Sequence, residues 1–140
     1  MLVLQVFRLK KYSFPKSKRL LTNSQFRSVL ACKKCVSDDM LLVYAAKNDC
    51  GRARLGISIH RNIGKAVVRN RLKRMIREVF RLNQDQIAGN FDYLVMVTPD
   101  WASKLNEMAS YSEVVKAASF EVIKDSLLKL MRLVAEKAKK

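Results

Sequence analysis

The sequence predicts an α/β protein of the α+β sandwich kind, in which helices pack on a small mixed sheet in the order α-β-β-α-β-α. Three observations predict this fold class. Residues 54–60 alternate between apolar and small or polar side chains, as a half-buried strand does. Residues 65–81 contain no Gly or Pro and repeat apolar side chains at helical spacing. The chain has 140 residues, of which 49% are hydrophobic, so it is long enough for one domain with its own core.

The chain divides into an arm, one domain and a tail. Residues 1–13 are predicted to form a basic N-terminal arm, residues 14–134 a single domain, and residues 135–140 a basic tail. The apolar run at residues 1–4 is too short for the core of a signal peptide. Three cysteines are an odd count that fits reduced thiols. We therefore expect a cytoplasmic protein without a membrane partner.

The first helix is predicted from a capping box. Thr22 is followed three residues later by Gln25, and such a pair satisfies two backbone N–H groups at a helix start. We expect this helix to end near Lys34 and to carry Phe26 on its apolar face. Residues 40–46 are rich in strand formers and predict the first strand.

The second strand, over residues 54–60, has two unlike faces. One face carries Leu55, Ile57 and Ile59, and the other carries Gly56, Ser58 and His60. The second face is small and polar for a covered sheet. A glycine inside a strand also marks a place where another group approaches the backbone closely, and we expect such an approach at Gly56.

The helix predicted over residues 65–81 has an apolar side and a basic side. The apolar side carries Val68, Leu72, Met75, Ile76 and Val79, and the basic side carries Arg69, Asn70, Lys73, Arg74, Arg77 and Arg81. The apolar side is expected to pack on the sheet, which leaves the basic side for water or a ligand. Like charges four residues apart repel each other and destabilise the helix. A bound polyanion would neutralise these charges and remove the repulsion. The helix N-terminus favours phosphate as well.

The C-terminal third is predicted to contain a strand and a long helical region. Residues 91–98 are rich in strand formers, and Pro99 ends this strand. Ser110 and Glu113 form a second capping box. From there to the tail the pattern is helical, and it allows a break near Ser119.

The charge balance points to a nucleic acid as partner. The chain carries 28 Lys and Arg against 12 Asp and Glu, a net charge of +16. Such a charge destabilises a compact fold unless an anion neutralises it. Between residues 52 and 81 only Glu78 is acidic, so cations are concentrated in an ordered part of the chain. We expect phosphate contacts that depend strongly on salt and little on base sequence.

Residues 64–77, GKAVVRNRLKRMIR, resemble the signature of the bacterial ribonuclease P protein subunit. Three further stretches are similar to that family: FPKSKRLL at residues 14–21, RLGISI at residues 54–59 and DYLVMV at residues 92–97. The resemblance covers about residues 14–131. It implies the ribosomal protein S5 domain 2-like fold, with a left-handed β-α-β crossover that runs against the usual right-handed rule.

The resemblance also implies the function. In that family a catalytic RNA subunit uses Mg²⁺ to hydrolyse the phosphodiester at the 5′ end of precursor tRNA, and the protein binds this RNA and the single-stranded 5′ leader. The expected partners are therefore the catalytic RNA and precursor tRNA, without DNA, and no catalytic side chain or metal is assigned to the protein itself. The RNA-binding positions that the resemblance implies are Arg61, Lys65, Arg69, Asn70, Arg71, Lys73, Arg74 and Arg77, and the leader-cleft positions are Phe26, Leu30, Tyr44 and Ser58.

The chain departs from the family's pattern in a few places. The family often has an aromatic residue where this chain has Leu30, which removes one expected stacking platform. Residues 1 to about 12 and 108–118 look like additions, and the sequence indicates no role for them.

Other functions find less support. A nuclease acting alone needs two histidines or converging carboxylates, whereas this chain has only His60 and dispersed acids. Cys32 and Cys35 have the spacing of zinc ligands, but Cys50 stands alone, so free thiols are expected. A structural RNA-binding protein, such as a ribosomal protein, is the alternative that fits the composition equally well.

Overall fold

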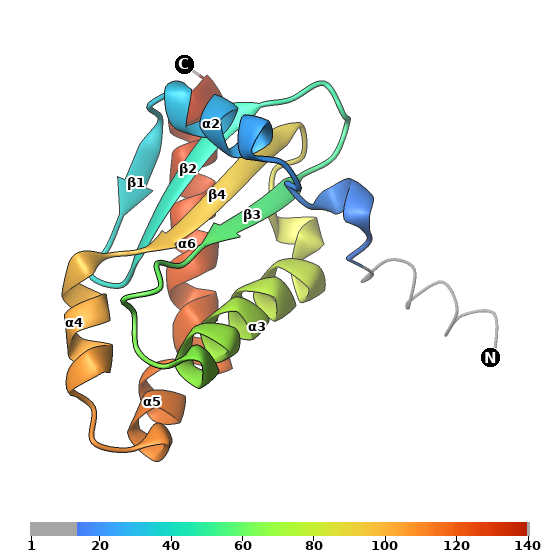
Figure 1. The fold of residues 1–140 in the computed structure, drawn as a ribbon. Helices are drawn as coiled ribbons and strands as arrows, with labels where there is room; N and C mark the ends of the chain where they lie inside the picture. The colour runs from blue at the N-terminus through green and yellow to red at the C-terminus, as the bar shows by residue number, and fades with distance from the viewer. Residues whose placement is uncertain (1–13, 140) are drawn as a thin grey trace, which may run out of the picture.

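A four-stranded mixed sheet lies at the centre of the computed structural model, which describes residues 14–139 (Figure 1). Its strands are β1 (Cys35–Ser37), β2 (Leu41–Lys47), β3 (Arg54–Ser58) and β4 (Phe91–Val97), in the order β1-β2-β4-β3. Strand β2 pairs antiparallel with β1 and β4, and β3 runs parallel to β4. A helix joins the parallel strands, so the β-α-β unit is present, and its left-handed sense stays a prediction.

Within residues 14–139, five α-helices surround this sheet. They are α2 (Asn23–Ala31), α3 (Ala66–Leu82), α4 (Pro99–Glu107), α5 (Tyr111–Ala117) and α6 (Phe120–Lys139), with short 3-10 helices η1 (Lys16–Lys18) and η2 (Gln84–Gln86). Helices α3 and α6 cover one face of the sheet, and α2 lies across one end of the other face (Figure 1). Helices α4 and α5 lie at the end of the molecule away from α2. The predicted arm, residues 1–13, lies outside the described residues.

Side chains along each strand alternate between the two faces of the sheet, so the sheet separates two apolar cores. The larger core lies between the sheet and helices α3 and α6, and its fully buried residues include Leu41, Val43, Leu72, Ile76, Tyr93, Val95 and Leu127. The smaller core lies under α2 and consists of Leu20, Val29, Ala46 and Leu94. The apolar side predicted for the helix at residues 65–81 is thus confirmed, and its basic side faces away from the sheet.

Most predicted elements are confirmed. The strands predicted over residues 40–46, 54–60 and 91–98 are β2, β3 and β4, and the helix predicted over residues 65–81 is α3. The capping box at the start of α2 forms, because the Thr22 hydroxyl accepts from the Gln25 N–H at 3.1 Å and the Gln25 side chain accepts from the Thr22 N–H at 3.1 Å.

The C-terminal helical region is divided as the sequence allows. Helix α5 ends at Ala117 and α6 begins at Phe120, and the Ser119 hydroxyl between them accepts from the Val122 N–H at 3.3 Å. Residues 135–139, assigned to the tail by composition, continue α6, with Ala135 buried.

Three features differ from the prediction. Helix α2 ends at Ala31 and not near Lys34, because Lys33 takes a φ of 55° and the chain turns into β1. The sequence does not indicate β1, whose three residues form a strand only because they pair with β2. It does not indicate α4 either. Thr98 is the N-cap of this helix and Pro99 is its first residue, a position in helices that proline favours. The proline expected to end a strand therefore also begins a helix.

Candidate nucleic-acid interface

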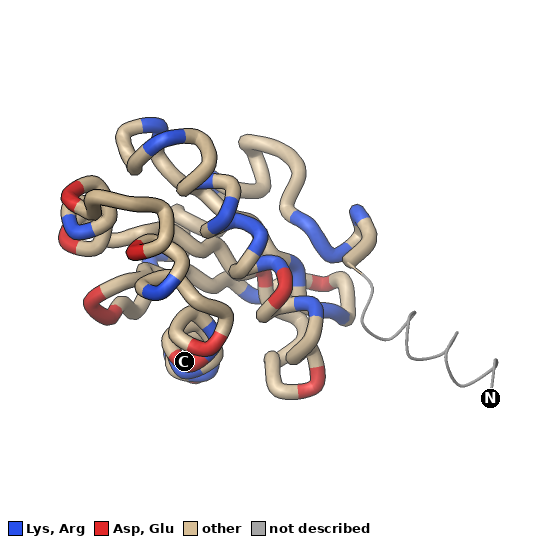
Figure 2. Tube along the Cα trace, turned by 90° about the horizontal axis from the view of Figure 1, so that it is seen from below, with Lys and Arg blue, Asp and Glu red and all other residues tan. Residues whose placement is uncertain are grey.

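Helix α3 presents a basic face on the side away from the sheet. Asn70, Arg74 and Arg77 are exposed there. Together with Lys73 and Glu78 they line a shallow depression of about 350 Å³. Viewed from below, the Lys and Arg positions follow α3 across the molecule (Figure 2). A concave surface of cations with an amide among them suits the phosphate backbone of a nucleic acid.

Glu78, the acid of this depression, is engaged by a neighbour. Its carboxylate lies 2.6 Å from the Arg81 guanidinium, three residues further along α3. The predicted basic side therefore contains one internal ion pair next to the cluster of Lys73, Arg74 and Arg77.

Two arginines of the motif have partners within the protein. The Arg69 guanidinium donates to the carbonyls of Arg61 at 2.9 Å and Gly64 at 2.8 Å, which fastens the preceding loop to the helix. The Arg71 guanidinium donates to the Val115 carbonyl of α5 at 3.4 Å, and its Nε is buried without a hydrogen-bond partner among the described residues. The sequence groups Arg69 with the free cations, whereas in the structure its side chain holds a loop in place.

Arg61 and Lys65 lie at the start of α3. Both are exposed, and Lys65 is the N-cap residue, whose side chain makes no capping hydrogen bond. The position combines two cations with the positive end of a helix, an arrangement that favours phosphate.

The sheet face beside α2 contains the predicted cleft residues. Strand register forms two rows across β3, β4 and β2, one of Gly56, Leu94 and Tyr44 and the next of Ser58, Met96 and Leu42. Because α2 covers only part of this face, Tyr44 is partly exposed and Ser58 is exposed. Phe26 of α2 and Tyr44 of β2 both pack, partly buried, against the small core under α2, and Leu30 lies one turn further along this helix. The structure therefore gathers all four predicted residues on one side of the sheet.

Gly56 allows the close approach that its position predicts. A Cβ atom on Gly56 would lie 2.8 Å from Phe26 Cε1 and 2.9 Å from Leu20 Cδ1. The groups that approach are thus side chains of the protein itself. Phe26 is held against the strand, which limits the orientations of its partly exposed ring.

A second depression joins the sheet face to the basic helix. It measures about 270 Å³ and is lined by Phe14, Arg19, Leu20, Leu21, Phe26, Leu55, Gly56, Ile57 and Arg77. Arg19 lies 4.7 Å from the centroid of the Phe14 ring and donates to the Phe14 carbonyl at 2.8 Å. Since Arg77 lines both depressions, the basic face and the sheet face form one continuous surface. The sequence gives no signal for Phe14 and Arg19 beyond their place in the stretch 14–21.

Potential catalytic and metal-binding side chains do not converge in the described part of the chain. Within residues 14–139, no three His, Cys, Asp or Glu residues are placed to hold a metal ion. Cys32, Cys35 and Cys50 are free thiols. The exposed His60 accepts at Nδ1 from the Asn62 N–H at 3.1 Å. None of the helices in this part of the chain is both long and apolar enough to cross a membrane.

Sequence comparison places the chain close to one group of proteins. The family model described as Ribonuclease P matches residues 14–133. A ribonuclease P protein component from Dictyoglomus thermophilum is 34% identical over 119 residues, which cover 85% of this chain and 89% of the relative. Another from Clostridium kluyveri is 36% identical over 113 residues, covering 79% of this chain and 96% of the relative.

Solved structures share the fold. The RNase P protein from Thermotoga maritima is 29% identical and matches with a TM-score of 0.68, over 82% of this chain and 96% of its own. The RNase P protein from Staphylococcus aureus is 27% identical with a TM-score of 0.63, over 84% of this chain and 95% of its own. These matches confirm the predicted α+β fold class.

Proposed function

Because this chain belongs to the ribonuclease P protein family, we propose that it is the protein subunit of a ribonuclease P and works with an RNA subunit to remove the 5′ leader from precursor tRNA. The family match over residues 14–133 favours this function over that of a ribosomal or other structural RNA-binding protein. The observation that carries the proposal is the continuous surface that joins the basic face of α3 to the sheet face beside α2.

The basic face of α3 is assigned to the RNA subunit. Lys73, Arg74 and Arg77 line one concavity, so they can contact neighbouring phosphates of a folded RNA. Each such contact releases condensed counterions, which makes the affinity strongly dependent on salt. The loop that Arg69 fastens brings Arg61 close to the same helix.

The sheet face is assigned to the single-stranded 5′ leader of precursor tRNA. Phe26 and Tyr44 offer partly exposed rings on which bases can stack, and the exposed Ser58 lies on the same face of the sheet, in the next row. The depression lined by Phe26 and Arg77 connects this face to the basic helix. The single-stranded 5′ leader can therefore run along one continuous protein surface, from the RNA subunit at the basic helix to the sheet face.

Hydrolysis itself is assigned to the RNA subunit. Mg²⁺ held by that RNA would activate the attacking water and stabilise the leaving oxygen. The protein is assigned the binding and orientation of the RNA subunit and of the leader, through its basic face and its sheet face.

Reconstitution tests the function. The RNA subunit is transcribed, and cleavage of a precursor tRNA is measured with and without the protein at low Mg²⁺. We expect the protein to raise the cleavage rate at the mature 5′ end, while the protein alone leaves the substrate intact. Cleavage by the protein alone, or no effect on the RNA subunit, would contradict the proposal.

The sheet face gives a prediction about substrate choice. Tyr44→Ala and Phe26→Leu together should reduce the preference of the holoenzyme for leader-bearing over mature tRNA by about thirtyfold or more, since two base stacks are lost and each is worth roughly 1–3 kcal/mol. Phe26→Leu keeps an apolar side chain against Gly56, so the strand contact is retained. Dissociation constants for precursors with leaders of graded length measure the effect.

Tyr44→Phe is the matched control, because it retains the ring, and it should keep most of the preference. If the double variant weakens binding of mature tRNA as much as binding of the precursor, the sheet face is not the leader site.

A further inference from the structure

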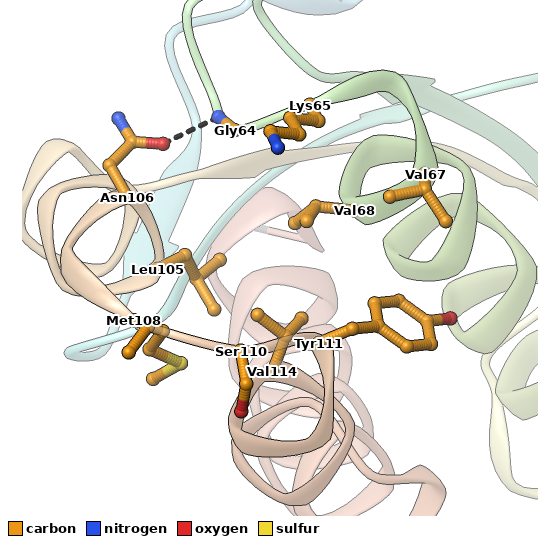
Figure 3. Close-up of a pocket in the computed structure, with 11 residues that line it drawn as sticks. Gly64, Lys65, Val67, Val68, Leu105, Asn106, Met108, Ser110, Tyr111 and Val114 are labelled. Atoms are coloured by element: carbon orange, nitrogen blue, oxygen red, sulfur yellow. Dashed lines mark hydrogen bonds between the residues drawn. The ribbon is translucent and has the colours of Figure 1, made fainter.

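A separate cavity of about 290 Å³ lies between the start of α3 and helices α4 and α5 (Figure 3). Its apolar lining comes from three helices, with Val68 of α3, Leu105 of α4 and Val114 of α5 buried. The basic face and the sheet face described above do not include this cavity. Its wall at Ala109 to Val114 falls in the stretch 108–118, for which the sequence indicates no role.

Hydrogen bonds tie both walls of the cavity to α3. The Asn106 side chain accepts from the Gly64 N–H at 2.5 Å and donates to the Asn62 carbonyl at 3.2 Å, which holds α4 to the loop before α3 (Figure 3). Arg71 of α3 donates to the Val115 carbonyl, which holds α5. The cavity is therefore part of the folded protein before any ligand enters.

Exposed apolar surface lies at the mouth of the cavity. Tyr111 is 47% exposed and Val67 is 51% exposed. In Figure 3 the Tyr111 ring extends from α5 towards the side of α3 that carries Val67. An aromatic ring with this exposure in a concave site offers a flat face to a planar ligand.

The polar groups around the mouth favour an anionic ligand. Lys65 is the charged residue of the lining, and the Glu113 carboxylate, which is not part of the lining, is engaged as the acceptor from the Ala109 N–H at 3.1 Å. Val67 precedes Arg71 by one helical turn and Arg74 by two, so the mouth adjoins the basic face of α3. The Ser110 hydroxyl accepts from the Glu113 N–H at 3.3 Å and keeps its own proton to donate.

Building on the proposed function, we propose that this cavity binds one unpaired nucleotide of the RNA subunit, with its base stacked on Tyr111 and its phosphate beside Lys65. The volume suits a single base and excludes a duplex. The RNA subunit is the source, because the cavity adjoins the N-terminal half of α3, whereas the depression that leads to the sheet face is lined by Arg77 near the other end of the helix.

Binding of the transcribed RNA subunit to three Tyr111 variants tests this inference. Tyr111→Leu keeps an apolar side chain for packing but removes the flat ring, and it should weaken binding by about tenfold or more, as expected for a lost base stack. Tyr111→Ala should do the same, and Tyr111→Phe should stay within about twofold of the wild type. Leu133→Ala, which removes another exposed apolar side chain on α6, is the control and should leave the affinity unchanged.

Base-specific chemical probing of the RNA subunit gives an independent readout. One unpaired base should be protected by the wild type and Tyr111→Phe but not by Tyr111→Leu. Wild-type affinity of Tyr111→Leu would overturn the inference, as would equal losses in the Phe and Leu variants. A loss of affinity confined to precursor tRNA, or a Tyr111-dependent dimer of this chain in sedimentation, would overturn it in favour of another occupant. Failure of the wild type to bind the RNA subunit at all would instead overturn the proposed function.

Discussion

Replacing Lys73, Arg74 and Arg77 together with Ala should weaken binding of the RNA subunit by roughly a hundredfold at about 0.1 M salt. These three side chains line one concavity on α3, and each is expected to neutralise a phosphate. Losing them should also reduce the slope of log K against log salt by about one unit for each contact. Titration of the RNA subunit at several salt concentrations measures both effects.

The choice of residues follows from the structure. Arg69 is left intact, because its guanidinium donates hydrogen bonds to the carbonyls of Arg61 and Gly64. Replacing it would free the loop before α3 in addition to removing a positive charge. The chosen side chains lie outside the apolar cores, so the fold should be retained.

A variant with the same loss of charge serves as the control. Lys129, Arg132 and Lys139 are exposed on α6, and replacing them with Ala should reduce the affinity much less. If both triple variants bind alike, net charge governs the affinity and the face of α3 has no special role.

Replacing Asp92 with Ala should lower the free energy of unfolding by about 2 kcal/mol, because it leaves a partly buried Arg54 without its carboxylate. Asp92 accepts from Arg54 Nε at 2.6 Å and Nη2 at 2.7 Å, and from Asn48 Nδ2 at 2.8 Å. The hydrogen bond with Asp92 raises the pKa of Arg54 above its ordinary value, against the opposing effect of burial. Arg54 and Asp92 are also direct partners across the parallel strands β3 and β4.

Urea unfolding, monitored by circular dichroism, measures this effect as a lower urea concentration at the midpoint, while the slope of the unfolding free energy against urea stays unchanged. Asp125→Ala removes an exposed carboxylate from α6 and should change the stability by less than about 0.5 kcal/mol. The double variant Arg54→Met with Asp92→Leu should recover most of the loss, since an apolar pair can replace a buried ion pair. If Asp92→Ala is as stable as the control, the pair contributes little to holding β3 against β4.

Local patterns in the sequence were sufficient for much of the fold. Alternation located β3, the spacing of apolar residues located α3 and its two sides, and the Thr22 capping box located the start of α2. These features depend on residues a few positions apart, and short-range steric and hydrogen-bonding rules govern them. The resemblance of residues 64–77 identified the family for the same reason, because the motif is contiguous.

Tertiary structure decided what depends on residues far apart in the chain. Strand β1 exists only through its pairing with β2, and Gly56 is approached by Phe26 only because α2 packs back onto the sheet. Arg69 and Arg71 look alike in the sequence, yet one fastens the loop before α3 and the other contacts α5.

The candidate surfaces show the same division between local pattern and packing. The sequence by itself supplied the basic side of α3 and the family, but it could not join Phe26 to Arg77 or form the cavity beneath Tyr111. Those arrangements result from long-range packing, which brings together side chains whose separation along the chain carries no information about their distance in space.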